Sequence, residues 1–497
     1  MLALLFCASI LSSESYLWRE IYARMLQRQV DLVVIGAGPA GQKGAIQAAK
    51  LGKKVVVVDP MDRLGGASLN LGTIPSKTLR EAILDLTGFR NRSYYGRGHQ
   101  EQAQISINDL NFRLQKVIED QHALIERQLA KNDIDYAHGA GRFVSEDCIE
   151  VVNGHGEVTE VMCAERFLIA TGSRPRNPEG VPFDDTTILD SNRILALEYL
   201  PESMLVLGGG IIGCEYGTMF AALGTHVTLI DKADRPLSLL DDGIGRRFGE
   251  YIEEMGVELN MQQIIKDIRR TEDGQAEVEV EGGEIFRAQC LFYALGRQAN
   301  TESLQLEKAG IWRDGRGFID VNPLFQSTND RVYAAGDVID RVALASTAME
   351  EGRLAVRNAF ALKTHQFPEF FPYGIYTIPE VSGVGPTEED LKEQNINYQI
   401  GLAYYYELGR GPIAGDTTGM FKLIFHAETL EVLAVHIIGS NATELIHIGQ
   451  LAIDFHARVH YFINQVFNYP TFAEGYRIAA LNGLNKLADR YKVDELP

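Results

Sequence analysis

Two glycine-rich turns, each followed by an aspartate at the same spacing, limit what this chain of 497 residues can fold into. Each turn has the form Gly-x-Gly-x-x-Gly and comes directly after a short run, at residues 30–35 and 204–207, that is apolar apart from Asp31. The residues concerned are Gly36, Gly38, Gly41 and Asp59 in the first unit, and Gly208, Gly210, Gly213 and Asp231 in the second. One such unit is a weak signal, but two in register predict an α/β chain that binds two dinucleotides.

The residue types at these positions follow from what a strand–turn–helix unit needs to hold a dinucleotide. Gly36 permits a tight turn, Gly38 lets the backbone approach a pyrophosphate, and Gly41 lets the helix pack closely on the strand. The N-terminus of the helix adds unpaired N–H groups and the positive end of its dipole. Asp59, at the end of the next predicted strand (residues 55–58), can accept hydrogen bonds from both ribose hydroxyls. We expect the same roles in the second unit.

Length, charge and composition narrow the remaining choices. A chain of 497 residues is too long for one hydrophobic core, so two or three domains are expected. A formal net charge of −20 argues against a nucleic-acid partner, because such partners favour lysine and arginine on the binding face. The five scattered cysteines favour reduced thiols in the cytoplasm. His456 and His460 have the spacing of helical metal ligands, but no glutamate follows the first, so we expect no metal.

The first thirteen residues are apolar, yet this run is shorter than the ~20 residues that a membrane-spanning helix needs. It also lacks the basic segment that precedes the apolar part of a secretory signal. Met25 lies just ahead of the first predicted strand. We therefore interpret residues 1–29 as an N-terminal extension that a mis-called start codon explains better than a targeting or membrane segment. N-terminal sequencing of the native protein tests this interpretation.

A third motif lies between the two units and carries the resemblance to a known family. Residues 65–77 read Gly-Gly-Ala-Ser-Leu-Asn-Leu-Gly-Thr-Ile-Pro-Ser-Lys. Together with the glycine turns, this segment resembles the pyridine nucleotide–disulfide oxidoreductases, whose members carry two redox cysteines five apart in the same frame. Ser68 and Thr73 occupy those two positions here. The frame is therefore intact, while the redox disulfide is absent.

The resemblance covers residues 30–490 and implies a domain order and two cofactor sites. It implies Rossmann-like domains for FAD (30–175 and 296–360) and for NAD(P) (176–295), then an α+β dimerisation domain (361–490). FAD would be bound tightly but non-covalently, NAD and NADP would be substrates, and the chain would form a homodimer or larger homo-oligomer. Beyond the turn residues, the cofactor-binding residues that it implies are Gly66, Ser68, Lys77, Thr171, Gly172, Arg297, Gly336 and Asp337.

Lys77 and Glu215 are the candidate catalytic pair. In the family that the chain resembles, the lysine of the Pro-Ser-Lys motif lies near flavin N5 and pairs with an acid just after the second glycine turn. Glu215 occupies that acid position here. A cation beside N1 or N5 would stabilise negative charge on the reduced flavin. The alternative interpretation, a surface lysine and an unrelated helical glutamate, is disfavoured because both residues lie in family frames.

Two parts of the family's thiol chemistry are missing together. The hydroxyl groups of Ser68 and Thr73 cannot accept electrons, and the family's His-Pro-Thr-x-x-Glu motif here begins with Tyr469. A tyrosine, with a pKa near ~10, is a poor base for a thiol at neutral pH. Residues 72–77 and 467–471 are instead similar to the soluble pyridine nucleotide transhydrogenases within this family. The chain departs from the pattern expected of that group at Ser68, where we expect a retained cysteine.

The function that follows is FAD-dependent hydride transfer between NADPH and NAD⁺, reversible and ping-pong through reduced flavin. One site must then accept both nucleotides: Asp231 favours the 2′-hydroxyl of NAD, whereas Lys232 and Arg235 could pair with the 2′-phosphate of NADP. The sequence leaves the preference and the direction open. An NAD(P)H oxidase or diaphorase that reduces oxygen or a quinone is the alternative enzyme, and a flavin-binding sensor is the alternative outside enzymes. A thiol–disulfide reductase fits least well.

Overall fold

The computed structural model describes residues 27–88 and 106–487. Most of the predicted N-terminal extension, including its candidate start at Met25, lies outside these residues. Among the residues described, no helix is long and apolar enough to cross a membrane. The described residues divide into two compact units: the first combines residues 27–70, 119–174 and 297–367, and the second combines residues 71–88, 106–118, 175–296 and 368–487.

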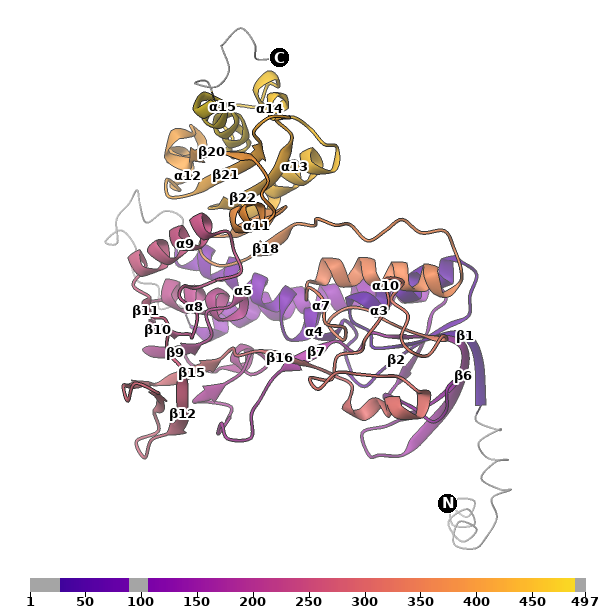
Figure 1. Ribbon diagram of the computed structural model, residues 1–497. Helices are drawn as coiled ribbons and strands as arrows, with labels where there is room; N and C mark the ends of the chain where they lie inside the picture. Colours follow the sequence, from indigo (N-terminus) through magenta and orange to yellow (C-terminus); the bar gives the residue numbers. More distant parts are fainter. Residues whose placement is uncertain (1–26, 89–105, 488–497) are drawn as a thin grey trace, which may run out of the picture. The chain divides into compact units, whose positions relative to one another are not determined.

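A seven-stranded sheet forms the first unit (Figure 1). Its order is β3-β2-β1-β6-β5-β4, and β17 also pairs with β6. The pairs among β3, β2, β1, β6 and β17 are parallel, whereas β4 and β5 pair antiparallel. The strands are β1 (Gln27–Ile35), β2 (Val55–Asp59), β3 (Asp135–His138), β4 (Ala140–Phe143), β5 (Cys148–Val152), β6 (Val158–Ile169) and β17 (Val332–Ala334). Val33 and Val34 of β1 are fully buried, which explains the apolar run at the end of this central strand, residues 32–35.

Two helices, α3 (Pro39–Lys50) and α10 (Ala345–Ala359), lie side by side in this unit (Figure 1). Their close crossing needs glycine, because a Cβ on Gly352 would lie 2.1 Å from the carbonyl oxygen of Ala40. The short helix α4 (Gly66–Asn70) and the two-stranded pair of β7 (Ser173–Pro175) with β16 (Arg297–Ala299) complete the parts used below.

Cys148 and Cys163 lie opposite each other on β5 and β6 and form a disulfide, with their Cα atoms 4.1 Å apart. The expectation of reduced thiols is therefore wrong for these two cysteines. Their spacing in the sequence gave no signal, because the pairing depends on the register of two antiparallel strands. Cys214 and Cys290 are free and buried.

The second unit contains the second nucleotide-binding sheet. Five parallel strands follow the order β11-β10-β9-β15-β8, and an antiparallel three-stranded sheet has the order β12-β13-β14. The strands are β8 (Ile188–Leu189), β9 (Ser203–Leu207), β10 (His226–Ile230), β11 (Glu258–Asn260), β12 (Ile265–Arg270), β13 (Ala276–Val280), β14 (Ile285–Ala288) and β15 (Cys290–Tyr293). The helices are α5 (Thr73–Leu86), α8 (Ile211–Leu223) and α9 (Asp242–Glu254). A further helix, α7 (Ile107–Lys131), has residues in both units.

The C-terminal part of the second unit is an antiparallel sheet with helices packed on it (Figure 1). Its order β18-β19-β22-β21-β20 uses β18 (Tyr373–Ile375), β19 (Val381–Val384), β20 (Tyr398–Tyr404), β21 (Met420–His426) and β22 (Val432–Ile438). The helices are α11 (Glu388–Glu393), α12 (Arg410–Ala414), α13 (Ala442–Asp454), α14 (His460–Asn464) and α15 (Gly475–Leu487). Helix α15 lies so close to β20 that a Cβ on Gly401 would be 1.9 Å from the carbonyl oxygen of Ala479.

The predicted fold class, two Rossmann-like α/β domains followed by an α+β domain, is confirmed. The strands expected at residues 30–35, 55–58 and 204–207 correspond to β1, β2 and β9. The domain boundaries predicted from the sequence stay a prediction.

Candidate active site

The first glycine turn joins β1 to α3, and contacts within the protein require two of its glycines. A Cβ on Gly36 would lie 2.3 Å from a neighbouring backbone carbonyl oxygen, and one on Gly41 would lie 1.9 Å from the carbonyl oxygen of Gly36. Gly36 also has a φ of +108°, which residues with a side chain rarely adopt. Asp59 fixes the turn, because its carboxylate accepts N–H bonds from Ala37 at 2.6 Å and Met61 at 2.8 Å.

The second turn, between β9 and α8, repeats this construction. A Cβ on Gly208 would lie 2.9 Å from a backbone carbonyl oxygen, and one on Gly213 would lie 1.8 Å from the carbonyl oxygen of Gly208. The carboxylate of Asp231 accepts N–H bonds from Gly209 at 2.6 Å and from Ala233 at 2.7 Å. The two units therefore share their backbone hydrogen bonds as well as their spacing in the sequence.

At the middle position of each turn, the packing of the described residues does not require glycine. A Cβ on Gly210 would meet nothing within 4 Å, and one on Gly38 would approach only the Cα of Gly66, at 4.0 Å. Each of these two glycines is the N-cap of its helix, and neither helix has a side-chain cap. Space and uncapped N–H groups at a helix N-terminus suit the pyrophosphate of a dinucleotide, so both turns fit the cofactors that the sequence predicts.

A partly buried polar network in the first unit includes Asp337, which follows β17. The hydroxyl of Ser173 donates to Asp337 at 3.0 Å, and Arg297 donates to the hydroxyl of Ser173 at 2.9 Å and to its carbonyl at 2.8 Å. Burial lowers the pKa of the Arg297 guanidinium, an effect that the nearby Asp337 carboxylate opposes. The structure thus brings together Arg297 and Asp337, two residues that the sequence implicated, through the hydroxyl of Ser173.

Two features of the same unit suit a polar ligand such as the flavin chain. The hydroxyl oxygen of Thr171 is buried and has no hydrogen-bond partner among the described residues. Gly172 and Gly336 both adopt positive φ, +68° and +78°, at the ends of strands. An unpartnered hydroxyl and tight turns at the strand ends are compatible with FAD at this place.

Glu351 of α10 is a buried acid that sequence reasoning missed. Its side chain is 2% exposed and accepts the N–H of Gly336 at 2.8 Å. Burial raises the pKa of this carboxyl to about 7, although the Gly336 hydrogen bond opposes the shift. The available signal was its place on the inward stripe of α10, one turn from Ala348 and Ala355.

Lys77 of α5 and Glu215 of α8 form an ion pair inside the second unit. The Nζ atom of Lys77 lies 2.9 and 2.7 Å from the two carboxylate oxygens of Glu215. Tyr376 donates its backbone N–H to the same carboxylate at 2.9 Å, and its ring centroid lies 5.2 Å from the ammonium. The Glu215 side chain is 5% exposed, against 26% for Lys77. The predicted pairing is confirmed, and the ammonium is its accessible end; its catalytic role stays a prediction.

The positions that hold thiol chemistry in the family hold hydroxyl groups here. Ser68 lies in α4, where its hydroxyl donates to the carbonyl of Gly65 at 3.0 Å, and Thr73 is the first residue of α5. Tyr469 is 74% exposed. One carboxylate oxygen of Glu474 is buried without a hydrogen-bond partner in the part of the chain that the structure describes. The acid of the C-terminal motif is thus kept, while its usual basic partner is not.

The residues expected near the 2′ group of the nucleotide differ in their exposure and in their partners. Lys232 is exposed, whereas Arg235 is half-buried and donates to the carbonyl of Leu240 at 2.9 Å. The guanidinium of Arg235 also lies 3.7 Å from a carboxylate oxygen of Asp242. Arg235 is therefore engaged by its own segment, and Asp231 and Lys232 are the charges open to a ligand.

His456 and His460 do not form a metal site with other side chains. His456 contacts the carboxylate of Glu431 at 2.6 Å. Within residues 27–88 and 106–487, no group of three or more His, Cys, Asp or Glu side chains is arranged to hold a metal.

Two sequence families match this chain. Residues 30–352 match the pyridine nucleotide-disulphide oxidoreductases, and residues 371–480 match the dimerisation domain of the same proteins. The chain therefore belongs to the pyridine nucleotide-disulphide oxidoreductase family. It is an oxidoreductase that uses FAD and nicotinamide dinucleotides, and its C-terminal part is the dimerisation domain of the family.

Within that family, the chain is similar to proteins named soluble pyridine nucleotide transhydrogenase. It is 44% identical to the one from Mycobacterium tuberculosis (strain ATCC 25177 / H37Ra), over 93% of this chain and 98% of the relative. It is 39% identical to the one from Azotobacter vinelandii, over 92% of this chain and 98% of the relative.

Solved structures show the same fold. LpdA from M. tuberculosis superimposes with a TM-score of 0.83 at 25% identity, and the HOCl-induced flavoprotein disulfide reductase RclA from Escherichia coli does so with 0.81 at 26%. Each comparison covers 91% of this chain and 99% of the other.

Proposed function

We propose that this chain catalyses reversible FAD-dependent hydride transfer between NADPH and NAD⁺. The observation that carries the proposal is the pair of hydroxyl side chains, Ser68 and Thr73, in a chain whose two dinucleotide units are otherwise complete. Reducing equivalents cannot pass from a flavin to a hydroxyl group. A second nicotinamide nucleotide is then the acceptor that the chain's own binding units provide. The names of the relatives support the same activity.

In this proposal, each dinucleotide unit serves one cofactor. The first turn, with Asp59, and the Arg297–Asp337 network would hold FAD, which would supply the two-electron redox chemistry for hydride transfer between nicotinamides. The second turn, with Asp231, holds NADPH or NAD⁺ in succession. Because one site serves both, the reaction is ping-pong.

Lys77 supplies the positive charge in this scheme, and Glu215 keeps it in place. The bidentate contact and the buried carboxylate hold the ammonium in one position without covering it. A fixed cation stabilises negative charge that develops beside it, because its orientation costs nothing at the moment of reaction. The remaining family positions, Gly66, Thr171, Gly172 and Gly336, line the FAD site in the same proposal.

Asp231 and Lys232 give the second site a mixed character. The carboxylate suits the 2′-hydroxyl of NAD and repels a phosphate, whereas the exposed ammonium attracts the 2′-phosphate of NADP. A site with both charges discriminates weakly, which is what a transhydrogenase needs.

We further propose a homodimer and a cytoplasmic location, with the FAD, NAD(P) and interface domains bounded as the sequence predicts. Large apolar side chains on the C-terminal domain support the dimer. Phe455 is 76% exposed, Leu451 57% and Tyr461 51%. Apolar side chains exposed together on one domain mark an interface.

Anaerobic mixing of the purified holoprotein with NADPH and thio-NAD⁺ tests the proposal. We expect thio-NADH to form at a rate that depends on bound FAD, with parallel double-reciprocal lines for the two nucleotides. No thio-NADH, together with oxygen consumption by NADPH alone in air, would replace transhydrogenation by the oxidase activity. Intersecting lines would exclude the ping-pong order.

A further inference from the structure

Residues 231–240, here called the strap, connect β10 to α9 and carry Asp231, Lys232 and Arg235. The strap lies against the second glycine turn through two hydrogen bonds. The N–H of Leu237 donates to the carbonyl of Gly209 at 2.7 Å, and the N–H of Gly209 donates to Asp231 at 2.6 Å. The position of the strap therefore determines the position of the glycine turn. It also determines where the charges of Asp231 and Lys232 lie, in the part of the site that would bind the 2′ group of the nucleotide.

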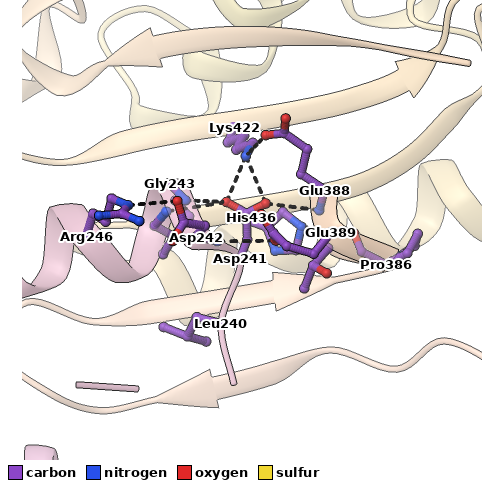
Figure 2. Close-up of polar contacts among 12 residues, drawn as sticks. Leu240, Asp241, Asp242, Gly243, Arg246, Pro386, Glu388, Glu389, Lys422 and His436 are labelled. Carbon is purple, nitrogen blue, oxygen red and sulfur yellow. Dashed lines mark hydrogen bonds and ion pairs between the residues drawn. The ribbon is translucent and has the colours of Figure 1, made fainter. Parts of the chain in front are cut away.

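The far end of the strap is held by Asp241, the N-cap of α9. Its carboxylate is 0% exposed and accepts from the N–H groups of Gly243 and Ile244, at 3.1 and 3.4 Å. Figure 2 shows that the same carboxylate also accepts hydrogen bonds from two residues of the C-terminal domain, Lys422 and Glu388. Both its oxygens lie 2.8 Å from the Nζ atom of Lys422, and the N–H of Glu388 donates to it at 3.2 Å.

Lys422 of β21 and Glu388 of α11 complete a buried charge cluster with Asp241 (Figure 2). The Lys422 ammonium, whose side chain is 5% exposed, lies 2.7 Å from a carboxylate oxygen of Glu388. Burial alone would raise the pKa of Glu388, but hydrogen bonds from Lys422, Lys392 and Tyr398 hold it at about 2. Glu388 is therefore ionised at neutral pH, and it balances Lys422 against Asp241.

His436 of β22 lies beside this cluster without adding a charge to it. Burial lowers its pKa, although the negative charge of Asp241 opposes the shift. Its Nε2 atom lies 3.2 Å from the carbonyl oxygen of Pro386, and its Nδ1 has no partner among the residues that the structure describes. The charges that pair with one another at the end of the strap are thus those of Asp241, Lys422 and Glu388, and the carboxylates of Asp242 and Glu389 lie next to them.

Stability alone is a weak reason to bury such charges. Buried ion pairs are often no more stable than apolar side chains of the same volume, because the charges lose their hydration. Three paired charges instead restrict the side chains that carry them to one arrangement. Here that arrangement ties the N-terminus of α9, and with it the strap, to two elements of the C-terminal domain.

We propose that Lys422 and Glu388 are positioning residues for nicotinamide-nucleotide binding: by holding Asp241, they fix the strap that carries Asp231 and Lys232. The inference rests on the proposed function only in taking the second dinucleotide unit as the nicotinamide site. Lys422 and Glu388 are far from that site in the sequence and act on it through the strap.

The test compares Lys422→Met with Glu277→Gln in the FAD-loaded protein. Glu277 is a suitable control because its buried carboxylate is held by Arg269 and Arg287, at 2.6 and 2.5 Å, on the three-stranded sheet of the same unit. The measurements are dissociation constants for NADP⁺ and NAD⁺ by calorimetry, FAD content, and the rate of trypsin cleavage after Lys232. That bond is the strap's single tryptic site, because Arg235 precedes Pro236.

For Lys422→Met we expect both dissociation constants to rise about tenfold, as mutations in a coupling network do. Cleavage after Lys232 becomes faster, and FAD content is unchanged. For Glu277→Gln we expect wild-type dissociation constants and wild-type cleavage. Unchanged values for Lys422→Met, or equal rises for Glu277→Gln, would overturn the proposal.

If Lys422→Met does not fold, Glu388→Gln decides the question. This variant keeps the N–H bond to Asp241 but removes the balancing charge, so a smaller rise of about threefold is expected. Wild-type affinity and cleavage in Glu388→Gln would overturn the proposal. Because binding is measured without turnover, a chain that fails to transfer hydride still gives an answer.

Discussion

In both dinucleotide units an aspartate accepts two backbone N–H bonds, but the two aspartates differ in their surroundings. Asp59 is 5% exposed, and burial raises the pKa of its carboxyl, although N–H bonds from Ala37 and Met61 oppose this. Asp231 receives an equivalent pair of N–H bonds but is only half-buried. A closed site suits a cofactor that stays, and a more open one suits nucleotides that come and go.

The segments that follow the two aspartates differ in the same sense. After Asp59, the hydroxyl of Tyr136 lies 3.0 Å from the carbonyl oxygens of both Asp59 and Met61, which share its one hydrogen, and this contact fixes the chain locally. After Asp231, the strap is held at its far end by Asp241 and Lys422, which are 181 residues apart. The motif thus fixes the turn in both units, while the segment after each aspartate is held by different, remote residues.

The third glycine of each turn gives the largest expected effect. In Gly41→Ala the new Cβ would lie 1.9 Å from a carbonyl oxygen, and in Gly213→Ala 1.8 Å, so the helix must move away from the turn. We expect Gly41→Ala to be purified without FAD. We expect Gly213→Ala to keep FAD but to lose its bleaching by NADPH. Absorbance at 450 nm before and after NADPH measures both, and loss of FAD in Gly213→Ala would break the assignment of the two units.

Replacing Lys77 by Met tests the cation of the second unit. We expect flavin reduction by NADPH to slow about 100-fold, as when a preorganised group that stabilises developing charge is removed. Lys53→Met is a matched control, because that ammonium is 29% exposed and also lies over a ring, that of Phe360. Stopped-flow rates for the two variants decide the role of Lys77. Equal rates would mean that the pair with Glu215 is only structural.

The raised pKa of Glu351 predicts that the stability of the first unit depends on pH. Its folded-state pKa, about 7, lies above its ordinary value of 4.5, so the folded state holds the proton more tightly. The stabilisation is complete below about pH 4.5 and is lost as the pH rises through about 7. Glu351→Gln can still accept the Gly336 N–H and removes this loss. We expect the variant to be more stable than the wild type at pH 8 by about 3 kcal/mol.

Denaturant unfolding of the wild type and Glu351→Gln at pH 5 and pH 8 measures this difference. A stability difference that does not change between the two pH values would show that Glu351 is ionised throughout.

Asp231→Asn gives the smallest expected effect. It tests whether the half-buried Asp231, unlike the buried Asp59, acts directly on its nucleotide. The amide can still accept the N–H of Gly209, but the repulsion of a 2′-phosphate disappears. We expect the dissociation constant for NADP⁺ to fall about fivefold while that for NAD⁺ rises slightly, because an exposed charge pair contributes about 1 kcal/mol. Titration calorimetry measures both, and an unchanged ratio would remove Asp231 from the discrimination.

The parts of the fold and of the site that could be predicted from the sequence are those that depend on local patterns. The glycines and Asp59 could be placed because their spacing is a property of one strand–turn–helix unit. The pairing of Lys77 with Glu215 could be predicted because both lie in family frames. The disulfide between Cys148 and Cys163 could not, because it depends on strand register.

The buried charges were missed for a related reason. Glu351 and the cluster of Asp241, Lys422 and Glu388 become visible only when remote elements are packed together. In the sequence, each is an acid or a base in an ordinary amphipathic segment. No local spacing distinguishes such a residue from one that faces solvent.

The most direct test of the claim that electrons leave through a nicotinamide is their partition from one limiting pulse of NADPH. The holoprotein is mixed anaerobically with excess thio-NAD⁺ and an excess of a small disulfide, lipoamide or oxidised glutathione. Thio-NADH is read by absorbance, and thiols are read by a colorimetric reagent. We expect all the reducing equivalents in thio-NADH and none in thiols. Thiol formation that rivals thio-NADH would contradict an exit confined to the nicotinamide by Ser68 and Thr73.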